Sequence, residues 1–153
     1  MSIPYLTKSG VVNIKFRCVA EHDCKAEKCP KYLGIHGMRP RLFGVNAFFD
    51  PGRVIGISEG ELDSVVGTFE CGIPTVGYPG TNSWQAHYGR LFEGYARVLI
   101  FSDGDDAGRK AAKEVLSSVP QGQIIMLPPG GDLNSVFLAE GRDGVRSRCG
   151  LVD

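Results

Sequence analysis

Residues 98–115 read VLIFSDGDDAGRKAAKEV, and this stretch decides the fold class. Four apolar residues and Ser102 lead into Asp103, Asp105 and Asp106, and a segment with helical periodicity follows at once. A short, β-branched run that leads into a helix is typical of one βα unit of a parallel sheet. Helix capping explains one of the three aspartates well, because a single N-cap side chain satisfies the exposed amides. The other two aspartates are not explained by capping, so the junction predicts a functional site as well as a fold class.

The same pattern recurs from residue 54 onward. Three more short apolar runs, flanked by glycine or polar residues, predict strands: RVIGIS, IPTVGY and QIIMLP. Between the first two, one helical stripe is formed by Leu62, Val65, Val66 and Phe69, and Gly72 stands where a C-cap glycine is expected. The helix that follows Asp106 has its own apolar face, made of Ala107, Ala111, Val115 and Val119. Alternating strands and helices predict an α/β domain with a mostly parallel four-stranded sheet flanked by helices.

Residues 1–53 have a different pattern. The alternation in VVNIKFRCV predicts a half-buried strand, and a charged, cysteine-rich loop and the segment GMRPRLFGVNAFF follow it. We expect a small, basic α+β subdomain over residues 1–53 and the α/β domain over residues 54–153, with the boundary near Pro51 and Gly52.

Charge is balanced overall but unevenly distributed. The chain has 17 basic and 17 acidic residues, so net charge gives no argument for a nucleic-acid partner. Residues 1–58 hold nine positive and four negative side chains, whereas residues 59–132 hold five and ten. This asymmetry is expected if one part attracts phosphates and the other collects cations, although scattered surface charge would also produce it.

Nothing in the sequence predicts a membrane partner. No apolar run approaches the roughly 20 residues that span a bilayer, and the first ten residues, MSIPYLTKSG, lack the apolar stretch of a signal peptide. We therefore expect a cytoplasmic protein, located in the host cytoplasm if a phage encodes it.

Five cysteines, an odd number, favour reduced thiols over a disulfide framework. Four potential zinc ligands lie close together in the sequence: Cys18, His22, Cys24 and Cys29. They lack the Cys-x2-Cys spacing of common structural zinc sites. We therefore do not expect zinc, and interpret the segment as a polar loop that carries thiols.

Acidic residues follow three of the four predicted strands. RVIGIS leads to Glu59, with Asp63 one helical turn further, RVLIFS leads to Asp103 and Asp105, and QIIMLP leads to Asp132. Ligands of parallel sheets gather at the carboxyl ends of the strands. Asp103 and Asp105 point the same way if the chain stays extended. Oxygen ligands without histidine select a hard ion, so these five acids predict a Mg²⁺ or Mn²⁺ site.

Two other interpretations of the DGDD segment fit less well. The calcium-loop pattern is satisfied at Asp103, Asp105, Gly108 and Glu114, but its fifth position is Ala107 and a strand precedes it where an EF-hand needs a helix. A haloacid-dehalogenase-type phosphatase has its D-x-D after the first strand of the fold, and here the motif follows the third.

Together, ISEGELDSV, VLIFSDGDDAGRKAA and GGDLNSVF resemble the TOPRIM domain of DnaG-type primases, topoisomerases and some nucleases, over about residues 52–140. EGELD followed by DGDDAGRKAA is most similar to primases, since topoisomerases usually carry D-x-D-x-E and Ala107 occupies that last position. MRPRLFGVNAFF also resembles the segment that precedes the core in phage primases, and VVNIKFRC the basic strand of their N-terminal subdomain.

The resemblance implies a DNA primase core, a metal-dependent nucleotidyltransferase that makes RNA primers from ribonucleoside triphosphates on single-stranded DNA. Glu59, Asp103 and Asp105 would be catalytic, with Asp63 and Asp132 as further metal ligands. Phosphates would be held by Lys15, Arg17, Arg39 and Arg41. A TOPRIM nuclease and a non-catalytic DNA-binding module are the alternatives. Phage primases generally have zinc-binding and often helicase domains, so these are either separate subunits or absent from a minimal core.

Overall fold

The computed structural model describes residues 1–50, 52–80 and 82–151, which form two compact units, Met1–Arg39 and Pro40–Asp153. The expected domain boundary between residues 53 and 54 stays a prediction, and Pro51 lies outside the described residues. Residues 40–50 group with the second unit, because Phe43 pairs with Gly77 through two backbone hydrogen bonds of 2.7 and 3.0 Å.

The first unit is a three-stranded antiparallel sheet. Its strands are β1 (Ser2–Thr7), β2 (Gly10–Arg17) and β3 (Tyr32–Gly34), in the order β1-β2-β3. The predicted strand VVNIKFRCV is β2, apart from its last two residues, Cys18 and Val19. Residues 1–39 are all described and contain no α-helix, so the helical part expected of this subdomain is limited to the short 3-10 helix η1 (Val45–Phe49).

The second unit is built on a parallel sheet with the four predicted strands. These are β4 (Val54–Glu59), β5 (Thr75–Tyr78), β6 (Arg97–Ser102) and β7 (Gly122–Met126). They lie in the order β5-β4-β6-β7, and every neighbouring pair is parallel. The predicted α/β architecture is therefore confirmed.

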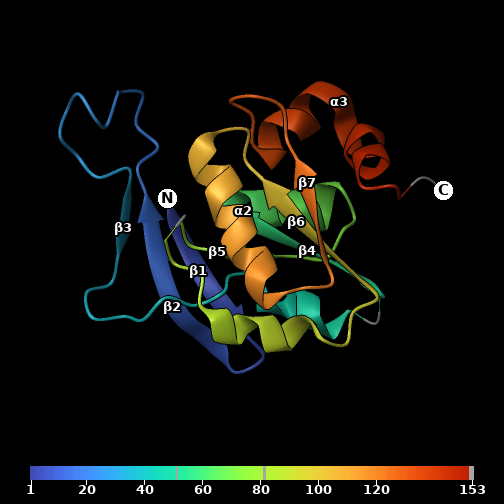
Figure 1. Ribbon diagram of the computed structural model, residues 1–153. Helices are drawn as coiled ribbons and strands as arrows, with labels where there is room; N and C mark the ends of the chain where they lie inside the picture. Colours follow the sequence, from blue (N-terminus) through green and yellow to red (C-terminus); the bar gives the residue numbers. More distant parts are fainter. Residues whose placement is uncertain (51, 81, 152–153) are drawn as a thin grey trace. The chain divides into compact units, whose positions relative to one another are not determined.

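Helices flank both faces of this sheet (Figure 1). The helical segments are α1 (Glu61–Val65), η2 (Val66–Glu70), η3 (Ala86–Phe92), α2 (Asp106–Ser118) and α3 (Leu133–Arg148, broken at Gly141). Because strand side chains alternate, Val98 and Ile100 pack in one core with Val115 of α2. Leu99 and Phe101 pack in a second core with Leu133 of α3. None of the described helices is long and apolar enough to cross a membrane.

The segment after β4 is helical as predicted, but the face it buries was not predicted. Val65 and Phe69 of the expected stripe are 37% and 76% exposed, whereas Glu61, Ser64 and Gly67 are buried. The reason is close approach, since a side chain at Gly67 would come within 2.5 Å of Thr75 Oγ1. The helix also widens into a π-helix over Val66–Glu70, and Gly72, just after the C-cap residue Cys71, has the left-handed φ that was expected there.

Candidate active site

The predicted acids follow the carboxyl ends of three strands of the parallel sheet. We call this set the acidic edge: Glu59, Asp63, Asp103, Asp105 and Asp132. Glu59 ends β4, Asp103 follows β6, and Asp132 precedes α3 after β7. The chain runs from β4 outward to β5 and then returns to β6 on the other side of β4. Such a reversal leaves a crevice between neighbouring strand ends, where ligands of open α/β sheets bind. Glu59 ends one of the two strands at this point, and Asp103 directly follows the other.

Glycines bring the loop after β6 against the loop after β7. A side chain at Gly104 would lie 1.7 Å from the carbonyl oxygen of Pro128, so only glycine fits there. The contact allows two backbone hydrogen bonds, from Gly104 to Gly131 (2.9 Å) and from Gly130 to Gly104 (3.2 Å). Gly131 directly precedes Asp132, and Gly104 directly follows Asp103. The two loops therefore carry these acids to the same place.

Two of the acids cap helices. The Asp105 carboxylate accepts a hydrogen bond of 2.6 Å from the Gly108 amide at the start of α2. Asp132 begins α3 in a capping box, in which it accepts from the Ser135 amide (2.7 Å) and donates its own amide to Ser135 Oγ (2.9 Å). Capping fixes the orientation of each carboxylate and uses one of its two oxygens. Of the three aspartates in residues 103–106, Asp105 is thus the one that caps the helix.

Asp63 joins two elements of the acidic edge. It is 8% exposed, and its Oδ1 accepts a hydrogen bond of 3.1 Å from the Asn134 amide in the first turn of α3. This bond ties α1 to the helix that Asp132 caps. The contact gives Asp63 a positioning role, and its role as a metal ligand stays a prediction.

The charges of the acidic edge meet at Asp103. The pKa of this carboxyl is raised from 3.8 to about 7, first by burial and then by the negative charges of Asp63, Glu59, Asp132 and Asp105. Asp105 comes last among these causes. β6 ends at Ser102, and Asp105 caps α2 with an extended backbone conformation. The expectation that Asp103 and Asp105 point the same way stays a prediction. Carboxylates whose charges repel in this way favour a bound cation.

The acidic edge has the donors that a hard divalent ion requires, since all five side chains offer oxygen and no histidine belongs to the set. Its carboxylates are not drawn tightly together, however. Within residues 1–50, 52–80 and 82–151, only a Cys–His cluster in the first unit places three or more potential ligand atoms within 4.8 Å of one another. A more open arrangement suits Mg²⁺, which usually keeps several waters and binds one or two carboxylates together with phosphates.

The predicted phosphate contacts separate into two groups. Lys15 and Arg17 lie on one face of β2, as their spacing predicts, and both contact the ring of Tyr32 on β3. Lys15 Nζ is 4.7 Å from the ring centroid, and Arg17 also donates a hydrogen bond of 2.8 Å to the Tyr32 hydroxyl. Arg39 ends the first unit, whereas Arg41 belongs to the second, and both are exposed.

Three residues near these groups were not predicted from the sequence. Tyr32 supplies an aromatic ring over which both Lys15 and Arg17 lie, a cation–π arrangement. Tyr78 ends β5, and its pKa is raised chiefly by burial and then by Glu59 and Asp103, so it borders the acidic edge. The Ser58 hydroxyl is buried beside Glu59 and has no hydrogen-bond partner in the described part of the chain. Aromatic residues at strand ends were the available signal, but their apolar character suggested only a core role.

Comparison with known proteins agrees with this geometry. Residues 57–137, more than half of the chain, match the Toprim-like family. The chain belongs to this family. Gene 57 protein of Mycobacterium phage D29 is 37% identical over 148 residues, which cover 97% of this chain and 96% of that protein.

Two DNA primases are also similar to this Toprim-like protein. The DNA primase of Pseudomonas aeruginosa is 37% identical over 102 residues, covering 61% of this chain and 15% of that protein. A solved DnaG primase catalytic domain bound to single-stranded DNA is 26% identical, with a TM-score of 0.78 over 97% of this chain. The chain spans 50% of that domain. The resemblance to the TOPRIM domain of DnaG-type primases is thereby confirmed.

Proposed function

We propose that this chain is the catalytic core of a DNA primase, which joins ribonucleotides on a single-stranded DNA template. The observation that carries the proposal is that the ends of the neighbouring strands β4 and β6 lead to Glu59 and Asp103, and that four other acids raise the pKa of Asp103. The similarity to primase catalytic domains, one of them bound to single-stranded DNA, supports the choice of reaction.

The acids have separate roles in this proposal. Asp103 and Asp105, together with Glu59 and Asp132, would hold Mg²⁺ or Mn²⁺. A divalent ion bound there would neutralise the incoming triphosphate and lower the pKa of the attacking 3′-hydroxyl. Asp63 keeps the start of α3 in place through the Asn134 amide. Glu59 is the candidate general base if it does not bind metal.

The basic residues would hold the nucleic acid and the nucleotide. Lys15 and Arg17 are half-buried against Tyr32, so their charges are held in place on the sheet surface. Arg39 and Arg41 are exposed and would add phosphate contacts. Such contacts raise affinity without reading sequence. A separate zinc-binding or helicase subunit would supply template choice and movement along DNA.

The test is primer synthesis by the purified chain. The reaction contains Mg²⁺ or Mn²⁺, single-stranded DNA and labelled ribonucleotides, with and without an annealed primer. We expect labelled RNA with the wild type and a loss of at least about 100-fold with Asp103→Asn, because the amide keeps the shape but not the charge.

Asp106→Asn is the matched control. Its side chain is 99% exposed and pairs with Arg109 on the surface of α2, so this variant should retain activity. Cleavage of the DNA without extension would contradict the primase function and support a nuclease. DNA binding without either reaction, equally strong in Asp103→Asn, would support a non-catalytic DNA-binding module.

A further inference from the structure

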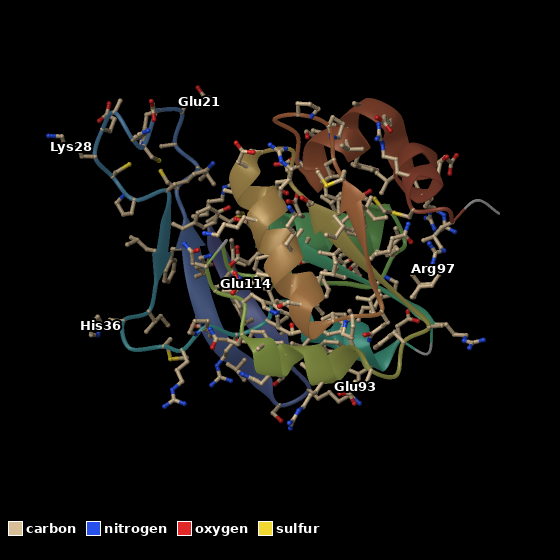
Figure 2. All side chains as sticks on the ribbon, viewed as in Figure 1. Glu21, Lys28, His36, Glu93, Arg97 and Glu114 are labelled. Atoms are coloured by element: carbon tan, nitrogen blue, oxygen red, sulfur yellow. The ribbon has the colours of Figure 1, made fainter. Side chains whose placement is uncertain are left out.

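The loop between β2 and β3 has almost no core of its own. In residues 18–31 only the three cysteines are partly buried, and every other side chain is exposed. Glu21 and Lys28 project outward from this loop (Figure 2). Few backbone hydrogen bonds close it, including those from Cys18 to Lys31 and from Cys29 to Cys24, each 3.0 Å. Apolar packing therefore does not explain why the loop has a defined shape.

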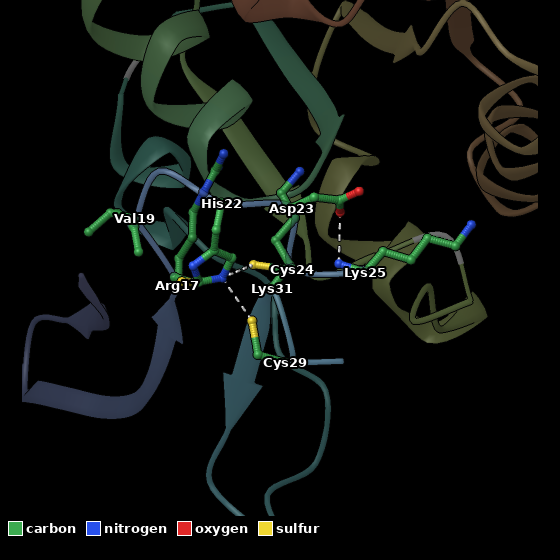
Figure 3. A pocket seen from close by; sticks show the side chains of 10 residues that line it. Arg17, Val19, His22, Asp23, Cys24, Lys25, Cys29 and Lys31 are labelled. Carbon is green, nitrogen blue, oxygen red and sulfur yellow. Dashed lines mark hydrogen bonds between the residues drawn. The ribbon is translucent and has the colours of Figure 1, made fainter. Parts of the chain in front are cut away.

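Three sulfurs of this loop surround one imidazole nitrogen. Nε2 of His22 lies 3.7 Å from Cys18 Sγ, 3.3 Å from Cys24 Sγ and 2.9 Å from Cys29 Sγ. Figure 3 shows the side chains of Cys24 and Cys29 directed at the His22 ring from different parts of the loop. The four ligand atoms all lie within 4.8 Å of one another.

Hydrogen bonding is a weak reason for this arrangement. Nε2 of a neutral imidazole is either one donor or one acceptor, so it pairs with one thiol, and the thiols also hydrogen-bond one another. A thiol is a weak donor and a weak acceptor, so these bonds alone would hold an exposed loop poorly. A disulfide would join two of the sulfurs and leave the third beside histidine, and all three thiols are free. A nucleophilic thiol would likewise need only one cysteine next to the imidazole.

We propose that Cys18, His22, Cys24 and Cys29 form a structural zinc site. Zn–S bonds of about 2.3 Å and Zn–N bonds of about 2.0 Å, at tetrahedral angles, place nitrogen and sulfur about 3.5 Å apart and two sulfurs about 3.8 Å apart. The observed nitrogen–sulfur distances of 2.9–3.7 Å lie around that value. Three thiolates and one imidazole complete the four ligands of a closed, structural site.

The spacing of the cysteines led us to expect no zinc, whereas the folded loop favours a zinc site. The order Cys-x3-His-x-Cys-x4-Cys contains no Cys-x2-Cys pair, yet the turn at Lys28, which has a φ of 53°, returns Cys29 to Cys24. Zinc would supply the folding energy that the exposed loop lacks. This site is independent of the acidic edge and of the proposed primase function.

The test is metal analysis of the full chain purified without chelator. We expect about one zinc per chain, and substitution by Co²⁺ should give the absorption of tetrahedral cobalt with thiolate ligands. Cys24→Ser and His22→Ala should each lower bound zinc at least about tenfold. His36→Ala is the matched control, since His36 is exposed and follows the opposite end of β3 (Figure 2), and it should keep full stoichiometry.

Thiol counting gives a second measurement that does not depend on a variant. Chelation should make three thiols reactive in the native protein, while Cys71 and Cys149 stay protected by burial until the chain unfolds. Protein without zinc, zinc retained in Cys24→Ser, or a mass two units lower from a disulfide would each overturn the proposal.

Discussion

At the scale of single residues, Asp103 is the carboxyl whose pKa the acidic edge raises. It is a partly buried carboxyl whose pKa is raised by burial and by the charges of four other acids, so its charged form is unfavourable until a cation binds. Its neighbours are held in place by unrelated contacts, such as helix capping at Asp105 and Asp132 and the Asn134 amide at Asp63. The repulsion is therefore built into the fold and is available to bind metal.

This repulsion makes stability depend on pH in chelator-treated protein. The pKa of Asp103 is about 7 in the folded state and 3.8 in the unfolded chain, so the folded state binds more protons between these values. The contribution that proton binding at Asp103 makes to the free energy of unfolding is fully present below about pH 4 and is lost as the pH rises through about 7. Asp103→Asn should remove this loss and raise the free energy of unfolding at pH 8 by about 1–3 kcal/mol, measured by urea denaturation.

Comparison across pH isolates the effect of Asp103. At pH 4 the wild type and Asp103→Asn should differ little, and Asp106→Asn should follow the wild type at every pH because its side chain is exposed. An Asp103→Asn variant with the same pH slope as the wild type would mean that Asp103 ionises freely.

At the scale of elements, the site depends on two loops that touch through glycine. The loop from β6 to α2 passes so close to the loop from β7 to α3 that no side chain fits at Gly104. Gly108 has a related role in the first turn of α2, because a side chain there would lie 2.7 Å from both Cβ and the carbonyl oxygen of Asp103. Close packing of these turns sets the separation of Asp103 from Asp132.

Gly104→Ala tests this packing. The new methyl group meets backbone atoms that cannot move aside, so we expect a loss of stability of at least about 1–3 kcal/mol and weaker Mn²⁺ binding in a calorimetric titration. Gly94→Ala is the matched control, since an added side chain there meets nothing within 4 Å. It should change stability by no more than about 0.5–1 kcal/mol. Equal stability of the two variants would contradict the close approach.

At the scale of the whole molecule, the chain divides its charge between two compact units. The antiparallel sheet of Met1–Arg39 carries Lys15 and Arg17 beside an aromatic ring, and the parallel sheet of the second unit carries the acidic edge. A polymerase needs both properties, one for template phosphates and one for cations. A small-molecule phosphatase needs only the second.

A salt titration of single-stranded DNA binding tests the role of the first unit. The double variant Lys15→Ala with Arg17→Ala should weaken binding and reduce the slope of log affinity against log salt by about 0.7 per lost phosphate contact. Mn²⁺ binding at the acidic edge should not change. Lys113→Ala with Arg90→Ala removes the same charge from exposed positions of the second unit, and its slope should match that of the wild type. If the two double variants behave alike, the template does not contact β2.

Much of the second unit could be predicted because its signals are local. The runs RVIGIS and RVLIFS are short, β-branched and bounded by polar residues, so each predicts a buried strand without knowledge of its neighbours. Acids that follow such strands must reach the same edge of a parallel sheet, which is why Glu59, Asp103 and Asp132 were predicted together. The DnaG-type resemblance followed from the same residues.

The sequence by itself thus determined the order of strands and helices and the acids at their junctions, since those depend on periodicity and on neighbouring residues. Only the tertiary structure decided which face of the segment after β4 is buried, because Gly67 must lie against Thr75, a residue from another strand. It also decided that Tyr32 lies beside Lys15 and Arg17, which depends on strand register. The Cys–His cluster is the clearest case, because irregular spacing along the chain hides three thiols that the folded loop brings to one imidazole nitrogen.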